Sequence, residues 1–151
     1  MHKENLMSDL SYFLSEHIRE IENIKESLLN GYYSNNTIES MNVENFFKDY
    51  INTVNAYLNS SKVCSGNSNC PFVIIKSTVE VQDMDDMDTY LYHIVPPYHE
   101  GANHDADYAS CLSPLGRALL FKSINQKVQV ETPAGVLRYI IRKITVPELS
   151  T

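Results

Sequence analysis

Residues 112–122, Leu-Ser-Pro-Leu-Gly-Arg-Ala-Leu-Leu-Phe-Lys, decide the fold expected for the C-terminal half of this chain. Ser113 is a good N-cap, because its hydroxyl can accept a hydrogen bond from an unpaired amide of the first helical turn. Pro114 falls at the first helical position, where its missing N–H is not needed. An apolar face follows at helical spacing, made of Leu115, Ala118, Leu119 and Leu120. The stretch therefore predicts a short, capped helix that packs on a core.

Segments rich in β-branched residues lie on both sides of this helix. The expected strands are, in chain order, one or more within residues 72–81, then 89–95, 108–112, 127–131 and 136–146. Thr132-Pro133-Ala134-Gly135 separates the last two strands and is typical of a turn. The pattern predicts four or five antiparallel strands with the helix on one face, which is an α+β fold.

The N-terminal part of the chain has a helical pattern. Apolar residues recur at heptad spacing within residues 3–29, with Met7, Leu14, Ile21 and Leu28 in one row. A second helix is expected to begin between residues 37 and 42, with Ser40 or Asn42 as its cap. Because neither apolar stripe can be buried alone, the two helices are expected to form an antiparallel hairpin, or coiled coil. The predicted domains are a helical arm at residues 1–62, a linker at 63–70 and a sheet domain at 71–151.

Composition limits the classes of partner. The chain of 151 residues carries a formal net charge of −7, so it lacks the positive surface with which proteins hold nucleic-acid phosphates. Direct sequence-specific contact with nucleic acid is therefore not expected. No signal peptide and no apolar run long enough for a bilayer is visible, which favours a cytoplasmic protein without membrane contact. The expected state is a monomer, or a weak homodimer formed through the hairpin.

Three cysteines are present, at positions 64, 70 and 111. An odd number without a secretion signal favours reduced thiols. Cys64 and Cys70 bracket a polar loop and could pair under oxidation. Zinc ligation together with His93, His99 or His104 is a further alternative, but the spacing of Cys64 and Cys70 differs from that of zinc knuckles. We expect no metal site and no cofactor.

Two motifs resemble a known family. Ser-Pro-Leu-Gly-Arg-Ala-Leu-Leu at residues 113–120, followed by Val-Gln-Val-Glu-Thr-Pro-Ala-Gly at residues 128–135, is similar to the C-terminal domain of the GreA/GreB transcript-cleavage factors. The resemblance covers residues 71–146 by motif and the whole chain by architecture. It implies an FKBP-like sheet domain preceded by a helical hairpin. Residues 115–120 also resemble the regulator of nucleoside diphosphate kinase, a Gre-like relative with a shortened hairpin.

The resemblance implies a partner, RNA polymerase. In the family, the FKBP-like domain docks at the rim of the polymerase secondary channel through the loop at the start of the Ser-Pro helix. Here that loop corresponds to Leu112, Ser113 and Pro114. Gre factors usually carry an acidic or amide residue at the position of Leu112, so an apolar contact is expected to replace the electrostatic one in this chain.

The resemblance also directs attention to the hairpin tip, where family members carry two carboxylates that help to hold a catalytic magnesium ion. Magnesium needs close oxygen ligands, but the sequence offers Glu39 between residues 30 and 42 and then Glu44 on the helix. We therefore expect a bacterial transcription elongation regulator that binds the secondary channel without efficient stimulation of transcript cleavage, and that is not an enzyme. The alternatives are a genuine cleavage factor using Glu39 and Glu44, and an FKBP-like peptidyl-prolyl isomerase.

Overall fold

A computed structural model describes five ranges of the chain, which are residues 9–31, 33–34, 37–60, 70–97 and 107–146. The chain divides into two compact units, residues 1–68 and residues 69–151.

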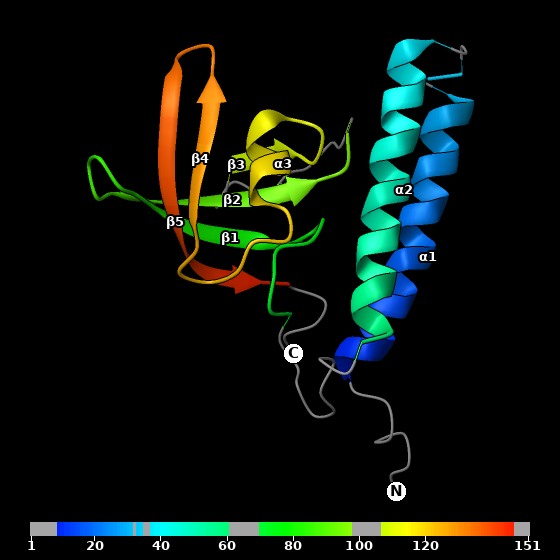
Figure 1. The fold of residues 1–151 in the computed structure, drawn as a ribbon, viewed down its shortest axis with the longest axis horizontal. Helices are drawn as coiled ribbons and strands as arrows, with labels where there is room; N and C mark the ends of the chain where they lie inside the picture. The colour runs from blue at the N-terminus through cyan, green and yellow to red at the C-terminus, as the bar shows by residue number, and fades with distance from the viewer. Residues whose placement is uncertain (1–8, 32, 35–36, 61–69, 98–106, 147–151) are drawn as a thin grey trace, which may run out of the picture. The chain divides into compact units, whose positions relative to one another are not determined.

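The first unit contains two helices, and the second contains a five-stranded sheet with one short helix (Figure 1). The helices of the first unit are α1 (Asp9–Asn30) and α2 (Ile38–Leu58). The second unit consists of β1 (Thr78–Asp83), β2 (Thr89–Val95), β3 (Asp107–Ser110), α3 (Pro114–Leu119), β4 (Lys127–Thr132) and β5 (Gly135–Thr145). In the part of the chain that the structure describes, no helix is long and apolar enough to cross a membrane.

α1 and α2 lie side by side as a hairpin (Figure 1). The predicted heptad row is confirmed where it can be followed, because Leu14, Ile21 and Leu28 are buried. Met7 and the expected helix start near residue 3 lie outside the described residues. The facing side chains of α2 are also buried, and they are Val43, Phe47, Tyr50, Ile51 and Val54. The two stripes therefore bury each other, which is the reason for the hairpin.

One polar pair lies inside this apolar seam. His17 of α1 and Tyr50 of α2 are each 2% exposed, and Nε2 of His17 lies 2.7 Å from the hydroxyl oxygen of Tyr50. The ring of Phe13 stacks on His17 with 5.9 Å between ring centroids. A hydrogen bond formed away from water has geometric requirements that apolar contacts lack, so this pair fixes the register of the two helices.

The cap of α2 differs from the prediction. Thr37 is the N-cap, and its hydroxyl accepts a hydrogen bond from the amide of Ser40 at 3.2 Å. The hydroxyl of Ser40 in turn accepts from the amide of Thr37 at 3.0 Å. The prediction of Ser40 or Asn42 as the cap is thus wrong. Ser40 occupies the third helical position, because the reciprocal pair satisfies two free amides whereas a single cap satisfies one.

The α+β fold class is confirmed, but the sheet is mixed. The strand order is β3-β2-β1-β5-β4, and the pairs β1–β2, β1–β5 and β4–β5 are antiparallel as expected. β3 instead runs parallel to β2, so the expectation of an entirely antiparallel sheet is wrong for this pair. Residues 96–106 separate the two strands. A connection of this length permits a parallel crossover, whereas a tight hairpin turn permits only an antiparallel return.

Side chains of the sheet alternate between two faces. One face belongs to the core and carries the fully buried residues Val79, Val81, Ile94 and Ile141. α3 packs against β3 and β4 and contributes the fully buried Leu119 to the core. The other face carries Glu80, Gln82 and Leu91, which are half-buried or exposed, and we call it the open face.

The pairing of β1 with β5 contains one irregularity. Glu80 pairs with Lys143, and Val81 pairs with Ile141. Arg142 is therefore an extra residue in β5, and the strand forms a β-bulge there. As a result Arg142 reaches Gln82 on the open face, and the next residue along the strand stays on that face as well.

Candidate functional site

The turn that precedes α3 is built around the hydroxyl of Ser113. This hydroxyl accepts a hydrogen bond from the amide of Gly116 at 3.0 Å and donates one to the carbonyl oxygen of Ser110 at 2.7 Å. Pro114 is the first helical residue. The predicted cap and the predicted proline position are both confirmed. The second hydrogen bond, to Ser110, ties the helix start to the end of β3.

The backbone of Leu112 is held from two sides. Its amide donates to the hydroxyl of Ser110 at 3.1 Å, and its carbonyl oxygen accepts from Nε of Arg117 at 3.1 Å. Leu112 is half-buried, whereas Pro114 is exposed. The structure therefore brings Leu112, Ser113 and Pro114 together on one short turn with few freely rotating backbone bonds.

Gly116 allows α3 to lie close to β3. A Cβ atom built at Gly116 would lie 2.0 Å from the carbonyl oxygen of Ser110, which is far inside van der Waals contact. Any other residue would have to push the helix away from the strand. The geometry of the turn thus depends on a glycine that does not itself face solvent.

Three residues that build this turn are absent from the sequence-based prediction, namely Ser110, Gly116 and Arg117. Two of them have signals in the sequence. A serine three residues before the cap is in reach of the local hydrogen bonds that serine commonly makes with nearby backbone. A glycine inside a helical pattern often indicates close packing. The contact of Arg117 with a backbone carbonyl has no comparable signal.

Cys111, directly before this turn, and Cys70, at the start of the second unit, are both buried. Burial raises the pKa of Cys111 from 9.0 to about 12, and it raises the pKa of Cys70 to about 11. Both are unpaired cysteines. Cys64, and with it the suggested pairing with Cys70, lies outside the described residues.

Of the three histidines considered as zinc ligands, the structure describes His93. Nδ1 of His93 lies 2.9 Å from the hydroxyl oxygen of Thr78, its neighbour across the sheet. His99 and His104 lie outside the described residues. Over the described ranges, no three His, Cys, Asp or Glu residues come together as metal ligands would.

The two acids at the hairpin tip do not converge. Glu39 is exposed in the first turn of α2, and Glu44 is half-buried with its carboxylate 3.6 Å from the ammonium group of Lys48. Residues five positions apart on an α-helix point about 140° apart around its axis. The first turn of α2 instead exposes two apolar side chains, Ile38 at 78% and Met41 at 52%.

Comparisons of the sequence with known proteins identify a family. The family model described as "Transcription elongation factor, GreA/GreB, C-term" matches residues 68–146, which is more than half of the chain. The GreA of Alkaliphilus oremlandii is 31% identical over 132 residues, covering 82% of this chain and 79% of that protein. The GreA of Thermotoga neapolitana is 25% identical over 142 residues, covering 94% of this chain and 87% of the relative. The GreA of Buchnera aphidicola subsp. Cinara cedri is 39% identical over 72 residues, and this match spans 44% of the relative's length.

Two solved structures are also similar. The GreA factor homolog 1 of Thermus thermophilus matches with a TM-score of 0.44 at 17% identity, over 90% of each chain. The GreA/GreB factor of Nitrosomonas europaea matches with a TM-score of 0.44 at 25% identity, over 63% of this chain and 78% of that one. With its family model and its relatives in agreement, the chain belongs to the GreA/GreB family of transcription elongation factors.

Proposed function

We propose that this protein binds bacterial RNA polymerase at the rim of its secondary channel and regulates elongation there, with the turn formed by Leu112, Ser113 and Pro114 as the docking point. The observation that carries the proposal is the double hydrogen bonding of the Ser113 hydroxyl, which fixes the turn in the domain that matches the family model. A fixed turn loses little conformational entropy on binding, so more of the contact energy remains as affinity.

The chemistry of the turn favours a largely apolar contact. Pro114 is exposed, Leu112 is half-buried, and neither carries a charge. The hydroxyl of Ser113 is already engaged within the turn. In this proposal Ser113 positions the turn, while Leu112 and Pro114 touch the polymerase.

We propose further that the protein does not stimulate transcript cleavage efficiently and is not itself an enzyme. Stimulation through magnesium requires two carboxylates that reach one ion. Glu39 and Glu44 point about 140° apart on an α-helix, and Glu44 already pairs with Lys48 at 3.6 Å. This geometry disfavours the alternative of a genuine cleavage factor that uses these two acids.

Docking is tested by co-purification of the full-length chain with RNA polymerase. The double variant Leu112→Ala, Pro114→Ala should lower the affinity at least about tenfold, because it removes the apolar contacts from the centre of the interface. Pro133→Ala is the matched control, since Pro133 is also an exposed proline but lies in the turn between β4 and β5. Equal binding by the double variant and the control would reject this docking point.

Cleavage is tested on a backtracked elongation complex with the same proteins. The unmodified chain should bind the complex and leave the transcript at its original length. Transcript shortening that disappears in Glu39→Gln or Glu44→Gln would instead establish a cleavage factor. The binding measurement on the same complex separates a protein that fails to cleave from one that fails to bind.

A further inference from the structure

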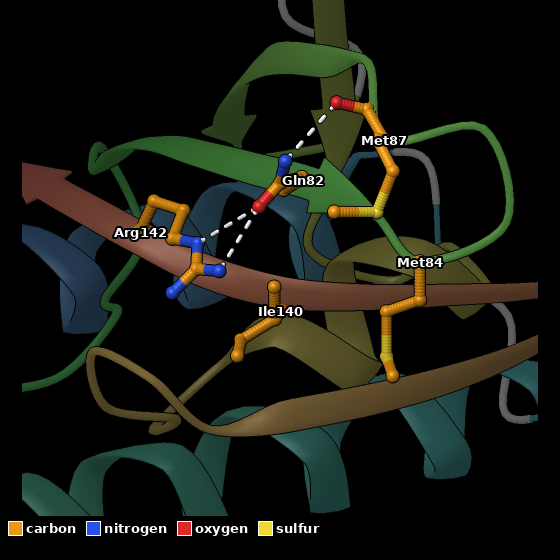
Figure 2. Close-up of a pocket in the computed structure, with 5 residues that line it drawn as sticks. All are labelled: Gln82, Met84, Met87, Ile140 and Arg142. Carbon is orange, nitrogen blue, oxygen red and sulfur yellow. Dashed lines mark hydrogen bonds between the residues drawn. The ribbon is translucent and has the colours of Figure 1, made fainter.

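A small pocket lies on the open face of the sheet, away from the turn before α3. It is lined by Gln82, Met84, Met87, Ile140 and Arg142 and has a volume of about 160 Å³ (Figure 2). Small-molecule sites usually measure roughly 300–1,000 Å³. The volume of this pocket is therefore large enough for one side chain of a protein segment and too small for a metabolite.

The guanidinium group of Arg142 forms the polar end of the pocket. Its Nε and Nη2 atoms donate to Oε1 of Gln82 at 3.1 and 3.0 Å (Figure 2). Its Nη1 atom donates to Oδ1 of Asn125 at 3.3 Å. Gln82 is itself fixed, because its Nε2 donates to the carbonyl oxygen of Met87 at 3.1 Å. The arginine is thus held in one orientation by other polar groups.

The groups that hold Arg142 are neutral amides, so they orient its positive charge without neutralising it. Among the described residues, no carboxylate forms an ion pair with it. A guanidinium group has five N–H donors, and the hydrogen bonds to Gln82 and Asn125 use one on each of its three nitrogens. Two N–H groups remain, one on each terminal nitrogen, and both can donate hydrogen bonds to a carboxylate.

The other end of the pocket is apolar. Met84 and Met87 are 38% and 60% exposed, and Ile140 lies between them and the arginine on β5 (Figure 2). Met87 has a positive φ of 67°, in a turn closed by a hydrogen bond from its amide to the carbonyl oxygen of Asp83 at 2.8 Å. Methionine side chains are flexible and polarizable, so they adapt to different apolar partners.

We propose that this pocket binds a segment of a partner protein in which an apolar side chain lies beside a carboxylate. The apolar side chain lies against Met84, Met87 and Ile140, and the carboxylate forms two hydrogen bonds with Arg142. The proposal does not depend on docking through the turn before α3, because the two sites share no residue.

Charge distinguishes this occupant from a nucleic acid. The turn next to the pocket contains four aspartates at positions 83, 85, 86 and 88. A chain of phosphates would meet repulsion from these groups along its length. A single carboxylate meets these groups at one point only and gains direct, charge-assisted hydrogen bonds from Arg142, which offset the repulsion.

The test is a methyl NMR titration of the full-length chain labelled at its methionine methyl groups. The probe is the dipeptide N-acetyl-leucyl-glutamyl-amide at millimolar concentrations. The methyl signals of Met84 and Met87 should shift and saturate, while that of Met41, which is exposed on α2, should not move. The neutral probe N-acetyl-leucyl-glutaminyl-amide should bind roughly tenfold more weakly, because a charge-assisted pair is lost.

Arg142→Gln should weaken binding of the acidic probe to the level of the neutral probe. Arg138→Gln is the matched control, since Arg138 lies on the same strand but pairs with Asp85 at 4.0 Å and does not line the pocket. Unchanged methionine signals, equal affinity for both probes, or equal weakening by both substitutions would overturn the proposal. A single-stranded oligonucleotide that shifts the same signals at lower concentration would also overturn it. The melting temperature of the second unit verifies that each variant is folded.

Discussion

The hydroxyl oxygen of Tyr50 lies 2.7 Å from Nε2 of His17, and both side chains are 2% exposed. This contact joins α1 to α2 inside a seam that is lined mainly by apolar side chains. It is a specific interaction in a place where apolar packing alone would permit the helices to slide by a turn.

Tyr50→Phe should therefore destabilise the hairpin. The substitution keeps the ring and removes the hydroxyl, which deprives a buried histidine nitrogen of this hydrogen bond and costs about 1–3 kcal/mol. The measurement is urea unfolding followed by the helical circular-dichroism signal. Tyr12→Phe is the control, because Tyr12 is 61% exposed on α1 and should leave the free energy of unfolding unchanged. Equal stability of the two variants would contradict a structural role for the pair.

Gly116→Ala should destabilise the second unit strongly. The new methyl group would lie 2.0 Å from the carbonyl oxygen of Ser110, and backbone cannot give way as a flexible side chain can. We expect a loss of about 3 kcal/mol or more. Pro114→Ala in the same helix is the control, since Pro114 is exposed and its replacement should cost well under that amount. Thermal unfolding of both variants measures the difference, and a Gly116→Ala protein as stable as Pro114→Ala would refute the close approach.

Thr37→Ala should weaken the start of α2 by about 1 kcal/mol, because it removes one half of the capping box. Thr37→Ser keeps the hydroxyl that accepts from the amide of Ser40 and should restore nearly all of that loss. Amide hydrogen exchange in the first turn of α2 reports the effect locally. Exchange that is equally fast in both variants would show that the hydroxyl is not responsible.

Alkaline pH should destabilise the second unit through its buried thiols. Burial raises the pKa of Cys70 from 9.0 to about 11 and that of Cys111 to about 12. The unfolded chain releases these protons near pH 9, whereas the folded chain retains them. The stability is therefore full below pH 9 and is lost as the pH rises toward the folded values, by up to about 1.4 kcal/mol per pH unit for each thiol.

The contribution of one thiol is isolated by comparing the variant Cys111→Ala with the unmodified chain. This variant should show a shallower loss of stability between pH 9 and pH 11 than the unmodified chain, because the ionisation of Cys111 no longer contributes. Groups common to both proteins cancel in the difference. Parallel pH profiles for the two proteins would show that Cys111 ionises equally easily in the folded and unfolded chains.

Helices and their faces could be read from the sequence where one local rule dominates. Ser113 and Pro114 form the cap and the first helical residue as predicted, because both preferences depend on neighbouring atoms. The heptad row of α1 is buried as predicted, since a long apolar stripe on a helix is removed from water only by packing against another element. The cap of α2 was misplaced because Thr37 and Ser40 act as a pair, and either hydroxyl looks suitable on its own.

The direction of β3 and the environment of Gly116 could not be read in this way. Whether β3 runs parallel or antiparallel to β2 depends on the path of residues 96–106, and the strand sequences are compatible with both directions. The restriction at Gly116 comes from a carbonyl oxygen six residues earlier, so it exists only after the helix has packed on the strand. The open-face pocket likewise combines residues of β1 and the turn after it with residues of β5, which are far apart in the sequence.

The bulge at Arg142 has a consequence for how this surface can change. Arg142 is the extra residue between the pairs made by Ile141 and Lys143. Its deletion would therefore restore regular pairing, and all remaining residues of β5 would stay on their present faces. Relatives can therefore gain or lose the guanidinium group by a single-codon insertion or deletion, without any rearrangement of the core. The sheet is complete with or without this arginine. The choice of partner at the pocket can therefore change in evolution while the fold stays the same.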